Sequence, residues 1–351
     1  MSFFFLFLIC IFAEVILKVA KVVLGLSDGV DSAVAAYILL KQGYDVEALY
    51  LDIAGEEALN AARNSAEQLN ISFAAIPVKD ELEEKVCKNF ESEYLNGHTP
   101  SPCVICNPAV KLPALIKRAD EIGAEFIATG HYAIKKDGSL YMNPYENDQS
   151  YMLARITDTQ LKRLLLPLGG RNKQEIRKLA KKLKLNAADR PDSRDNCFCK
   201  GSGYIDWLIN RNPQLKLLKG KVLYNSDIVA EHEGCFRFTV GQRWKSDIDG
   251  RRVYISHIDA AANTLYLDKW EDIFLSEFKV GDLKWLNEEP GTEFECSIRI
   301  RHTRRETPLC SVRIINGIAN VTAFEPVRAP APGQAAAFYI KNRLIGGGFL
   351  L

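Results

Sequence analysis

The stretch KVVLGLSDGVDSAVAAYILL at residues 21–40 decides the fold, because it combines a strand, a tight loop and the start of a helix. Lys21–Leu26 is a short, β-branched, apolar run, and after the loop apolar residues recur at helical spacing, at Val34, Tyr37 and Ile38. At such a junction the free backbone N–H groups and the helix dipole attract an anion. The sequence therefore predicts a phosphate site between this strand and this helix.

The elements that follow predict a parallel sheet around this loop. A second strand is expected at Asp45–Leu51, a helix at about Glu56–Leu69 and a third strand at Ile71–Val78. Strands that alternate with helices form a parallel sheet with right-handed crossovers. The loop is neither G-x-x-x-x-G-K-[ST] nor G-x-G-x-x-G, since no lysine follows it and its glycines are too few. An ordinary serine-capped helix start would explain Ser27 or Ser32 alone.

Beyond Gly203 the pattern changes to short strand runs separated by Gly, Asn and Asp, among them Lys221–Ala230 and Arg252–Ile258. Evenly spaced short strands with turn signals indicate a small barrel. The expected fold class is α/β, with a Rossmann-like parallel-sheet domain, a small central module and a C-terminal β-barrel. The expected boundaries are 1–20 for an apolar extension, 21–202 for the nucleotide-binding domain, 203–272 for the central module and 273–351 for the barrel.

Composition narrows the class of protein. The 351 residues exceed one ordinary domain, and 47% hydrophobic with 25% charged residues excludes disordered, collagen-like and multi-spanning membrane chains. The 45 Lys and Arg against 44 Asp and Glu leave a net charge of +1, so a polyanionic partner must bind local basic patches. The 9 cysteines lack the dense, even spacing of a secreted disulfide scaffold, which favours reduced thiols and a cytoplasmic location.

The N-terminus carries an apolar run at residues 3–13. A bilayer-spanning helix needs about 20 apolar residues, so this run is too short to cross a membrane. It also lacks the basic residues that precede the apolar part of a signal peptide. We interpret residues 1–20 as an extension, with a peripheral membrane anchor as the alternative, and expect no stable membrane partner.

Two cysteine motifs carry the candidate chemistry. Cys103 and Cys106 have C-x-x-C spacing in the turn-forming stretch HTPSPCVICN at 98–107, and Cys197 and Cys199 form a second pair. Such spacing is typical of a metal site, a redox pair or an activated nucleophile. A structural zinc is an alternative, although C-x-C is unusual for zinc. Buried, inert thiols are expected for the remaining cysteines, Cys10, Cys87, Cys235, Cys296 and Cys310.

The loop at 25–32 resembles that of the PP-loop ATP pyrophosphatases, whose S-G-G-x-D-S sequence binds ATP and supports its cleavage to pyrophosphate. This chain has Asp28 where that family usually has Gly. A carboxylate beside a phosphate site should repel the phosphate unless its side chain turns outward or binds Mg²⁺.

Several further motifs, in order from Lys21 to the C-terminus, resemble the tRNA-specific 2-thiouridylase family. They are GLSDGVDSAVAAYILL at 25–40, HTPSPCVICN at 98–107, IATGHYA at 127–133, NDQSYML at 147–153, LLPLGG at 165–170, DSRDNCF at 192–198, FTVGQR at 238–243 and PVRAPAPGQAAAFY at 326–339.

The resemblance implies an ATP- and Mg²⁺-dependent tRNA-uridine 2-sulfurtransferase. In this reading ATP adenylates the C2 oxygen of the wobble uridine, a persulfide on Cys106 supplies sulfur, and Cys197 is its partner in releasing it. A rival version has Cys103, Cys106 and Cys197 hold an iron–sulfur cluster that carries the sulfur. The implied ATP contacts are Gly25, Leu26, Ser27, Asp28, Gly29, Val30, Asp31, Ser32, Leu51 and Gly130.

The resemblance also implies partners: tRNA, and a sulfur-relay protein or cysteine desulfurase. Arg171–Lys184 is rich in basic residues, and strand-like alternation would place Arg299, Arg301, Thr303 and Arg305 on one face, so both stretches are candidate RNA-binding patches. The target base would be flipped out into the catalytic pocket. The implied tRNA contacts are His131, Asn147, Asp148, Gln149, Arg301, His302 and Gln334, although His131 is equally compatible with a structural role.

Two other functions fit part of the pattern. Another PP-loop adenylating enzyme would share the loop but does not call for the paired cysteine motifs or the trailing barrel. A non-catalytic tRNA-binding protein on a degenerate PP-loop fold is favoured by Asp28 and by Asn147, which stands where the family has a Lys. ATP-dependent release of pyrophosphate separates an enzyme from such a binder.

Overall fold

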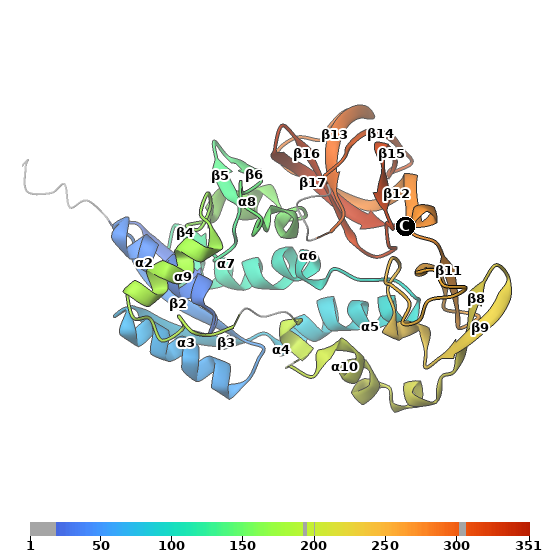
Figure 1. Ribbon diagram of the computed structural model, residues 1–351. Helices are drawn as coiled ribbons and strands as arrows, with labels where there is room; N and C mark the ends of the chain where they lie inside the picture. The colour runs from blue at the N-terminus through green and yellow to red at the C-terminus, as the bar shows by residue number, and fades with distance from the viewer. Residues whose placement is uncertain (1–18, 192–194, 200, 302–306) are drawn as a thin grey trace, which may run out of the picture.

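A computed structural model describes residues 19–191, 195–199, 201–301 and 307–351 (Figure 1). The apolar run at 3–13, the tRNA contact predicted at His302, and the strand face predicted at Thr303 and Arg305 lie outside these residues. None of the described helices is long and apolar enough to cross a membrane.

The N-terminal domain is built on a parallel sheet, as predicted. Its strand order is β3-β2-β1-β4-β7, and every neighbouring pair is parallel. Because β1 lies between β2 and β4, the chain changes direction across the sheet at this point, where α/β proteins bind ligands beyond the carboxyl ends of the strands. The strands are β1 Lys21–Gly25, β2 Asp45–Asp52, β3 Ser72–Pro77, β4 Phe126–Ala128 and β7 Leu164–Leu165.

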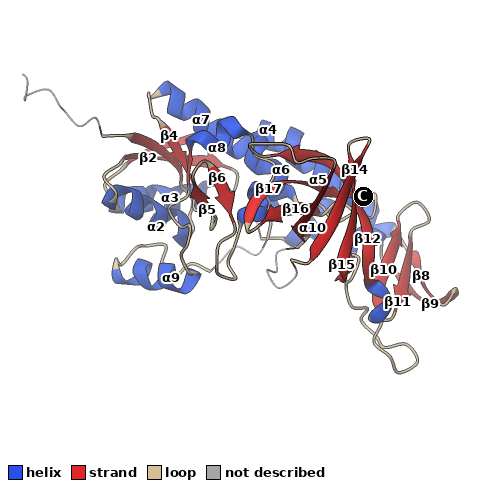
Figure 2. Cartoon of the chain, turned by 90° about the horizontal axis from the view of Figure 1, so that it is seen from above, coloured by secondary structure: helices blue, strands red, loops and turns tan. Residues whose placement is uncertain are grey.

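Helices cover both faces of this sheet (Figure 2). Val22 and Leu24 of β1 pack with α2 Val30–Lys41, whereas Val23 packs with Leu112 and Leu115 of α7. A strand that is buried on both faces needs apolar residues at every position, which explains the continuous run in β1. The other helices of the chain are α3 Glu56–Gln68, α4 Lys79–Leu82, α5 Lys88–Leu95, α8 Asp158–Arg163, α9 Lys173–Lys182 and α10 Gly203–Arg211.

The C-x-x-C motif lies on a short helix, α6 Pro102–Cys106. Pro102 occupies the first helical position, where its missing N–H costs nothing. The chain continues as a π-helical turn, η2 Asn107–Lys111, into α7 Leu112–Glu121. Short π- or 3₁₀-helical turns also occur as η1 Glu83–Cys87, η3 Ser150–Leu153, η4 Cys197–Cys199, η5 Pro213–Leu217, η6 Cys235–Arg237 and η7 Glu271–Ile273.

The central module is a sheet in the order β10-β11-β8-β9. The sequence predicted one strand run at 221–230, but the chain forms a hairpin there, because Asn225 and Ser226 adopt positive φ angles of 51° and 71° and reverse its direction. The strands are β8 Gly220–Tyr224, β9 Asp227–His232, β10 Tyr254–Asp259 and β11 Thr264–Asp268.

The C-terminal strands form the predicted β-barrel. They are ordered β12-β15-β14-β13-β16-β17, and β12 also pairs with β17, which closes the barrel. The hairpin of β5 Ile134–Lys136 and β6 Ser139–Tyr141, which belongs to the N-terminal domain, adds to the edge of β17. The barrel strands are β12 Phe274–Trp285, β13 Glu293–Arg299, β14 Leu309–Ile315, β15 Ile318–Arg328, β16 Ala335–Ile340 and β17 Arg343–Leu350.

Candidate active site

The loop between β1 and α2, residues 25–32, is held in shape by its two serines. The Ser27 N–H donates to Ser32 Oγ at 3.1 Å, and the Gly29 N–H donates to Ser27 Oγ at 3.1 Å. Gly29 precedes α2, and no side chain caps this helix. The first N–H groups of α2 are therefore available to an anion, as the sequence predicted.

Gly130 brings the end of β4 against this loop. A Cβ atom at Gly130 would lie 3.2 Å from the Asp31 carbonyl carbon and 3.2 Å from the Ser32 nitrogen. Only glycine allows this approach without displacement of the backbone. Of the predicted ATP contacts, Gly25, Leu26, Asp28, Ser32, Leu51 and Gly130 do not line the neighbouring cavity.

Asp31 is fixed by two residues that the sequence did not single out as site residues. The Lys173 Nζ lies 2.7 and 2.6 Å from the two Asp31 carboxylate oxygens, and the Tyr132 hydroxyl donates to Asp31 Oδ1 at 2.6 Å. Lys173 is the first residue of α9, so the stretch 171–184, predicted as an RNA-binding patch, also contacts the loop at residues 25–32. The carboxylate is thereby neutralised and oriented beside the loop.

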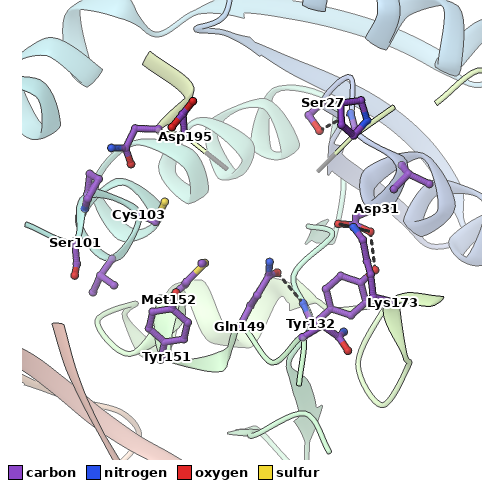
Figure 3. A pocket seen from close by; sticks show the side chains of 17 residues that line it. Ser27, Asp31, Ser101, Cys103, Tyr132, Gln149, Tyr151, Met152, Lys173 and Asp195 are labelled. Carbon is purple, nitrogen blue, oxygen red and sulfur yellow. Dashed lines mark hydrogen bonds and ion pairs between the residues drawn. The ribbon is translucent and has the colours of Figure 1, made fainter. Parts of the chain in front are cut away.

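A cavity of about 750 Å³ joins this loop to the C-x-x-C helix. Figure 3 shows Ser27 and Asp31 on one side of it and Ser101 and Cys103 on the other. Of the predicted site residues, those that line it are Ser27, Gly29, Val30, Asp31, Cys103, Asn147 and Gln149. The lining residues that were not predicted to bind a substrate are Ser101, Pro102, Val104, Tyr132, Tyr151, Met152, Lys173, Pro191, Asp195 and Asn196.

The three candidate cysteines lie near one another but in different surroundings. Cys103 is exposed in the cavity, whereas Cys106 is buried one helical turn away. Burial raises the pKa of Cys106 to about 11, against the opposing charge of Lys111, and the Cys197 and Cys103 thiols raise it further. The pKa of Cys197 is raised by desolvation first and by Cys103 second. Cys106 and Cys197 therefore need activation or persulfide formation before they act as nucleophiles at neutral pH.

Of residues 147–149, the first and last line the cavity and the middle one lies in the protein interior. Gln149 accepts from the Tyr132 N–H at 3.2 Å and lines the cavity with Asn147. Asp148 is completely buried, accepts from the Asn143 N–H at 2.6 Å and forms an ion pair with Arg299, which is also completely buried. The direct tRNA contact predicted for Asp148, and the RNA-binding face predicted for Arg299, are wrong in this structure, because these two groups neutralise each other at the junction with the barrel.

His131 is also an interior residue. It is 8% exposed, its Nδ1 lies 2.8 Å from the Thr129 hydroxyl, and burial lowers its pKa to about 3. The imidazole is thus neutral at physiological pH and cannot contribute a positive charge to phosphate binding. The structural role that the sequence left open for His131 is the one that its surroundings support.

A second cavity, of about 520 Å³, lies beside the first and shares Ser101 and Tyr151 with it. It is lined by the predicted tRNA contacts Arg301 and Gln334 together with Gln242 of the FTVGQR stretch. The two adjoining cavities together extend from the barrel to the loop at residues 25–32.

Comparison with known proteins decides the family. The chain is 35% identical to the tRNA-specific 2-thiouridylase MnmA of Carboxydothermus hydrogenoformans, over 93% of this chain and 96% of that protein. It is 36% identical to the protein of the same name from Sulfurimonas denitrificans, over 94% and 98% of the two chains. The chain belongs to the tRNA-specific 2-thiouridylase family.

Family models match this 2-thiouridylase family member in three segments. They are described as a tRNA methyl transferase HUP domain at residues 20–201, a tRNA methyl transferase PRC-barrel domain at 212–269 and an aminomethyltransferase beta-barrel domain at 275–350. A partial likeness also exists to the solved NMN synthetase of Francisella tularensis, at 20% identity and a TM-score of 0.36 over 54% of this chain and 73% of that one.

In this 2-thiouridylase family member, Asp28 adds a negative charge to the loop at residues 25–32. The structure shows where its carboxylate lies. Asp28 does not line the cavity, and its carboxylate instead forms an ion pair with Arg190 at 2.5 Å. Of the two ways to avoid repulsion that the sequence allowed, an outward-turned side chain is the one observed.

The thiols do not fit an iron–sulfur cluster as they stand. Among the residues that the structure describes, no group of three or more His, Cys, Asp or Glu side chains is placed to hold a metal ion, and Cys103, Cys106 and Cys197 are all within that part of the chain.

Sequence reasoning could have found some of the missed residues. The pattern N-x-x-E at Asn172 and Glu175 is a capping box and marks the start of a helix. It places Lys173 at the first position of that helix, at one end of the basic stretch. Tyr132 and Tyr151 lie inside the quoted stretches 127–133 and 147–153, but their roles depend on distant segments that they contact.

Proposed function

We propose that this protein makes 2-thiouridine at the wobble position of tRNA. ATP adenylates the C2 oxygen of the uridine and releases pyrophosphate. Sulfur from a cysteine persulfide then replaces that oxygen, and AMP leaves. Adenylation is needed because an oxide-like oxygen is a poor leaving group, whereas AMP is a good one.

One observation carries this proposal: a single cavity has the loop at residues 25–32 on one side and the C-x-x-C motif on the other (Figure 3). Activation and sulfur transfer must act on the same carbon atom, and so both groups have to reach one bound base. The cavity volume of about 750 Å³ can hold a nucleotide and a flipped-out uridine.

On the ATP side, the N–H groups at the start of α2 and the backbone of Ser27 and Gly29 would bind the phosphates. Lys173 would hold Asp31 in place at the cavity wall. Mg²⁺ that binds through ATP phosphates needs only one or two protein carboxylates, and Asp31 and Asp195 both line the cavity. It would neutralise phosphate charge during adenylation.

On the sulfur side, the terminal sulfur of a Cys106 persulfide would attack the adenylated carbon and expel AMP, leaving tRNA linked to Cys106 through two sulfur atoms. The Cys197 thiolate would then attack the Cys106 sulfur. The bond between the two sulfurs breaks, 2-thiouridine leaves, and a Cys106–Cys197 disulfide remains for an external thiol to reduce. Cys103, which is exposed beside them, would assist as an auxiliary thiol.

For tRNA, we propose contacts from Asn147, Gln149, Arg301 and Gln334, which line the two adjoining cavities. Exposed basic side chains of the 171–184 stretch extend this surface and would position the phosphate backbone; they are Arg171, Lys178, Lys181, Lys182 and Lys184. The sulfur would come from a sulfur-relay protein or a cysteine desulfurase. The thiol chemistry is compatible with a cytoplasmic location, since the described cysteines are free.

The test is the direct reaction. Anaerobically purified protein is incubated with unmodified tRNA, Mg-ATP and a persulfide source, and the nucleosides are analysed by mass spectrometry. ATP-dependent 2-thiouridine is expected, and a tRNA with cytidine at the wobble position should gain none. Bound tRNA without thiolated product or released pyrophosphate would refute the proposal in favour of a non-catalytic binder. Of the two features that favoured such a binder, Asp28 loses its force because Arg190 neutralises its charge.

A further inference from the structure

The PP-loop of this chain, residues 25–32, contains two carboxylates, and each is paired with a cation from a distant segment. Asp31 pairs with Lys173 at 2.6 Å, and Asp28 pairs with Arg190 at 2.5 Å. Asp28 stands where PP-loop proteins usually have Gly, so its negative charge is an addition to the loop. A negative charge beside a polyphosphate site repels the phosphates unless a nearby positive charge offsets it.

The local backbone turns the Asp28 side chain away from the cavity. The Ser27 hydroxyl accepts from the Gly29 N–H at 3.1 Å and so closes a tight turn around Asp28. Ser27, Gly29 and Val30 line the cavity, whereas Asp28 points to the side where Arg190 lies. The carboxylate is then beside the phosphate site without entering it.

Arg190 is itself held in position by α9. Its carbonyl oxygen accepts from both terminal nitrogens of Arg177, at 3.1 and 3.2 Å. The same helix supplies Lys173 to Asp31. One helix thus anchors both of the cations that face the loop, directly in one case and through the Arg190 backbone in the other.

We propose that Arg190 is a positioning residue for ATP in this protein: it cancels the extra charge of Asp28 and keeps that carboxylate turned away from the phosphates. This inference rests on the proposed function, because it assumes that the loop binds ATP. It predicts that Arg190 matters only while Asp28 carries a charge. An arginine that bound the phosphates directly, or that only stabilised the fold, would matter in either case.

The test is a double-mutant cycle on Mg-ATP binding, measured by calorimetry on the full chain without tRNA or a sulfur donor. R190Q should weaken ATP binding about tenfold, because an uncompensated charge then faces the phosphates. D28N should leave the affinity within about twofold of the starting protein, and D28N/R190Q should match D28N. R190K should retain most of the affinity, since it keeps the charge.

A second ligand separates charge from damage to the fold. Adenosine carries no phosphate, so R190Q should leave its affinity unchanged, whereas a distorted cavity would lose both ligands. The control is K21Q, which breaks the partly exposed Lys21–Asp45 pair of the same domain away from the loop and should change neither affinity.

The outcomes distinguish the two proposals. An equal loss of ATP affinity from R190Q with and without the Asp28 carboxylate, no loss at all, or a matching loss for adenosine would each overturn the role given to Arg190. If the unaltered protein binds no ATP, the proposed function itself fails.

Discussion

The PP-loop at 25–32 and the stretch 147–151 both carry polar residues of family motifs, but they use them in different ways. In the PP-loop, Ser27 and Asp31 both line the cavity, and the Ser27 hydroxyl also fixes the loop backbone by accepting from the Gly29 N–H. In the second stretch, Asp148 and Ser150 are completely buried and bonded to the barrel through Arg299 and Tyr339. A polar motif residue therefore either lines the cavity or holds together the domains that surround it, and burial separates the two cases.

This comparison gives Asp148 an architectural role. Arg299 lies at the end of β13, and its guanidinium group stacks on the Tyr151 ring at 4.5 Å. Tyr151 lines both cavities. The buried pair thus connects the barrel to the wall that the two cavities share.

The largest expected effect is at the sulfur-handling residue. C106S should abolish thiolation, since serine cannot form a persulfide, and should leave the binding of tRNA and ATP intact. Nucleoside mass spectrometry and binding assays measure these separately. C235S is the matched control, because it removes a buried thiol from the central module, and it should retain activity. Thiolation by C106S would show that the nucleophile is misassigned.

The buried ion pair provides the next test. D148N leaves the Arg299 charge buried without its partner and should destabilise the protein by about 3–5 kcal/mol in urea unfolding. Asp282, which pairs with Arg155 but is 63% exposed at the side chain, is the matched control from the same domain junction. D282N should cost less than about 1 kcal/mol. Similar costs for both variants would contradict the architectural role of Asp148.

A substitution at Gly130 tests whether the PP-loop needs its close contact with the end of β4. G130A places a Cβ atom 3.2 Å from the PP-loop backbone and should weaken ATP binding about tenfold by shifting the loop, with a smaller effect on stability. Calorimetric titration with Mg-ATP measures the first effect. G291A is the control, because its Cβ would meet its nearest atom at 3.9 Å. Unchanged ATP affinity in G130A would mean that the loop does not need this close approach.

The sequence predicted the fold well because its signals are local. The run at Lys21–Gly25, the alternation of strands and helices, and the evenly spaced strands of the C-terminal part all depend on neighbouring residues. The missed hairpin at Asn225–Ser226 is an exception that was readable, since Asn and Ser are turn residues.

The site was predicted in part for the same reason. Ser27, Gly29 and Asp31 belong to one loop, whose shape follows from its own sequence. The partners of Asp28, Asp31 and Asp148 come from segments more than one hundred residues away, and no local pattern specifies such pairs. Whether a polar residue ends in the cavity or in the interior is therefore decided by the packing of the domains.

The smallest expected effect is at His131, and it tests whether this residue belongs to the interior or to the cavity. Its pKa of about 3 in the folded protein lies below the 6.5 of an unperturbed histidine, so the unfolded chain binds the additional proton. Stability from the neutral imidazole is complete above pH 6.5 and decreases as the pH falls toward 3. Between pH 7.5 and 5.5 this one group should cost about 1.4 kcal/mol.

The measurement is the free energy of unfolding in urea at the two pH values. H131Q should be less pH-dependent than the unaltered protein by about 1.4 kcal/mol, whatever its absolute stability. H257Q, which removes an exposed histidine, is the control for the loss of an imidazole as such. If H131Q and the unaltered protein respond equally, the imidazole titrates normally. His131 would then be accessible to solvent and to tRNA phosphates, and it would belong with the PP-loop residues rather than with Asp148.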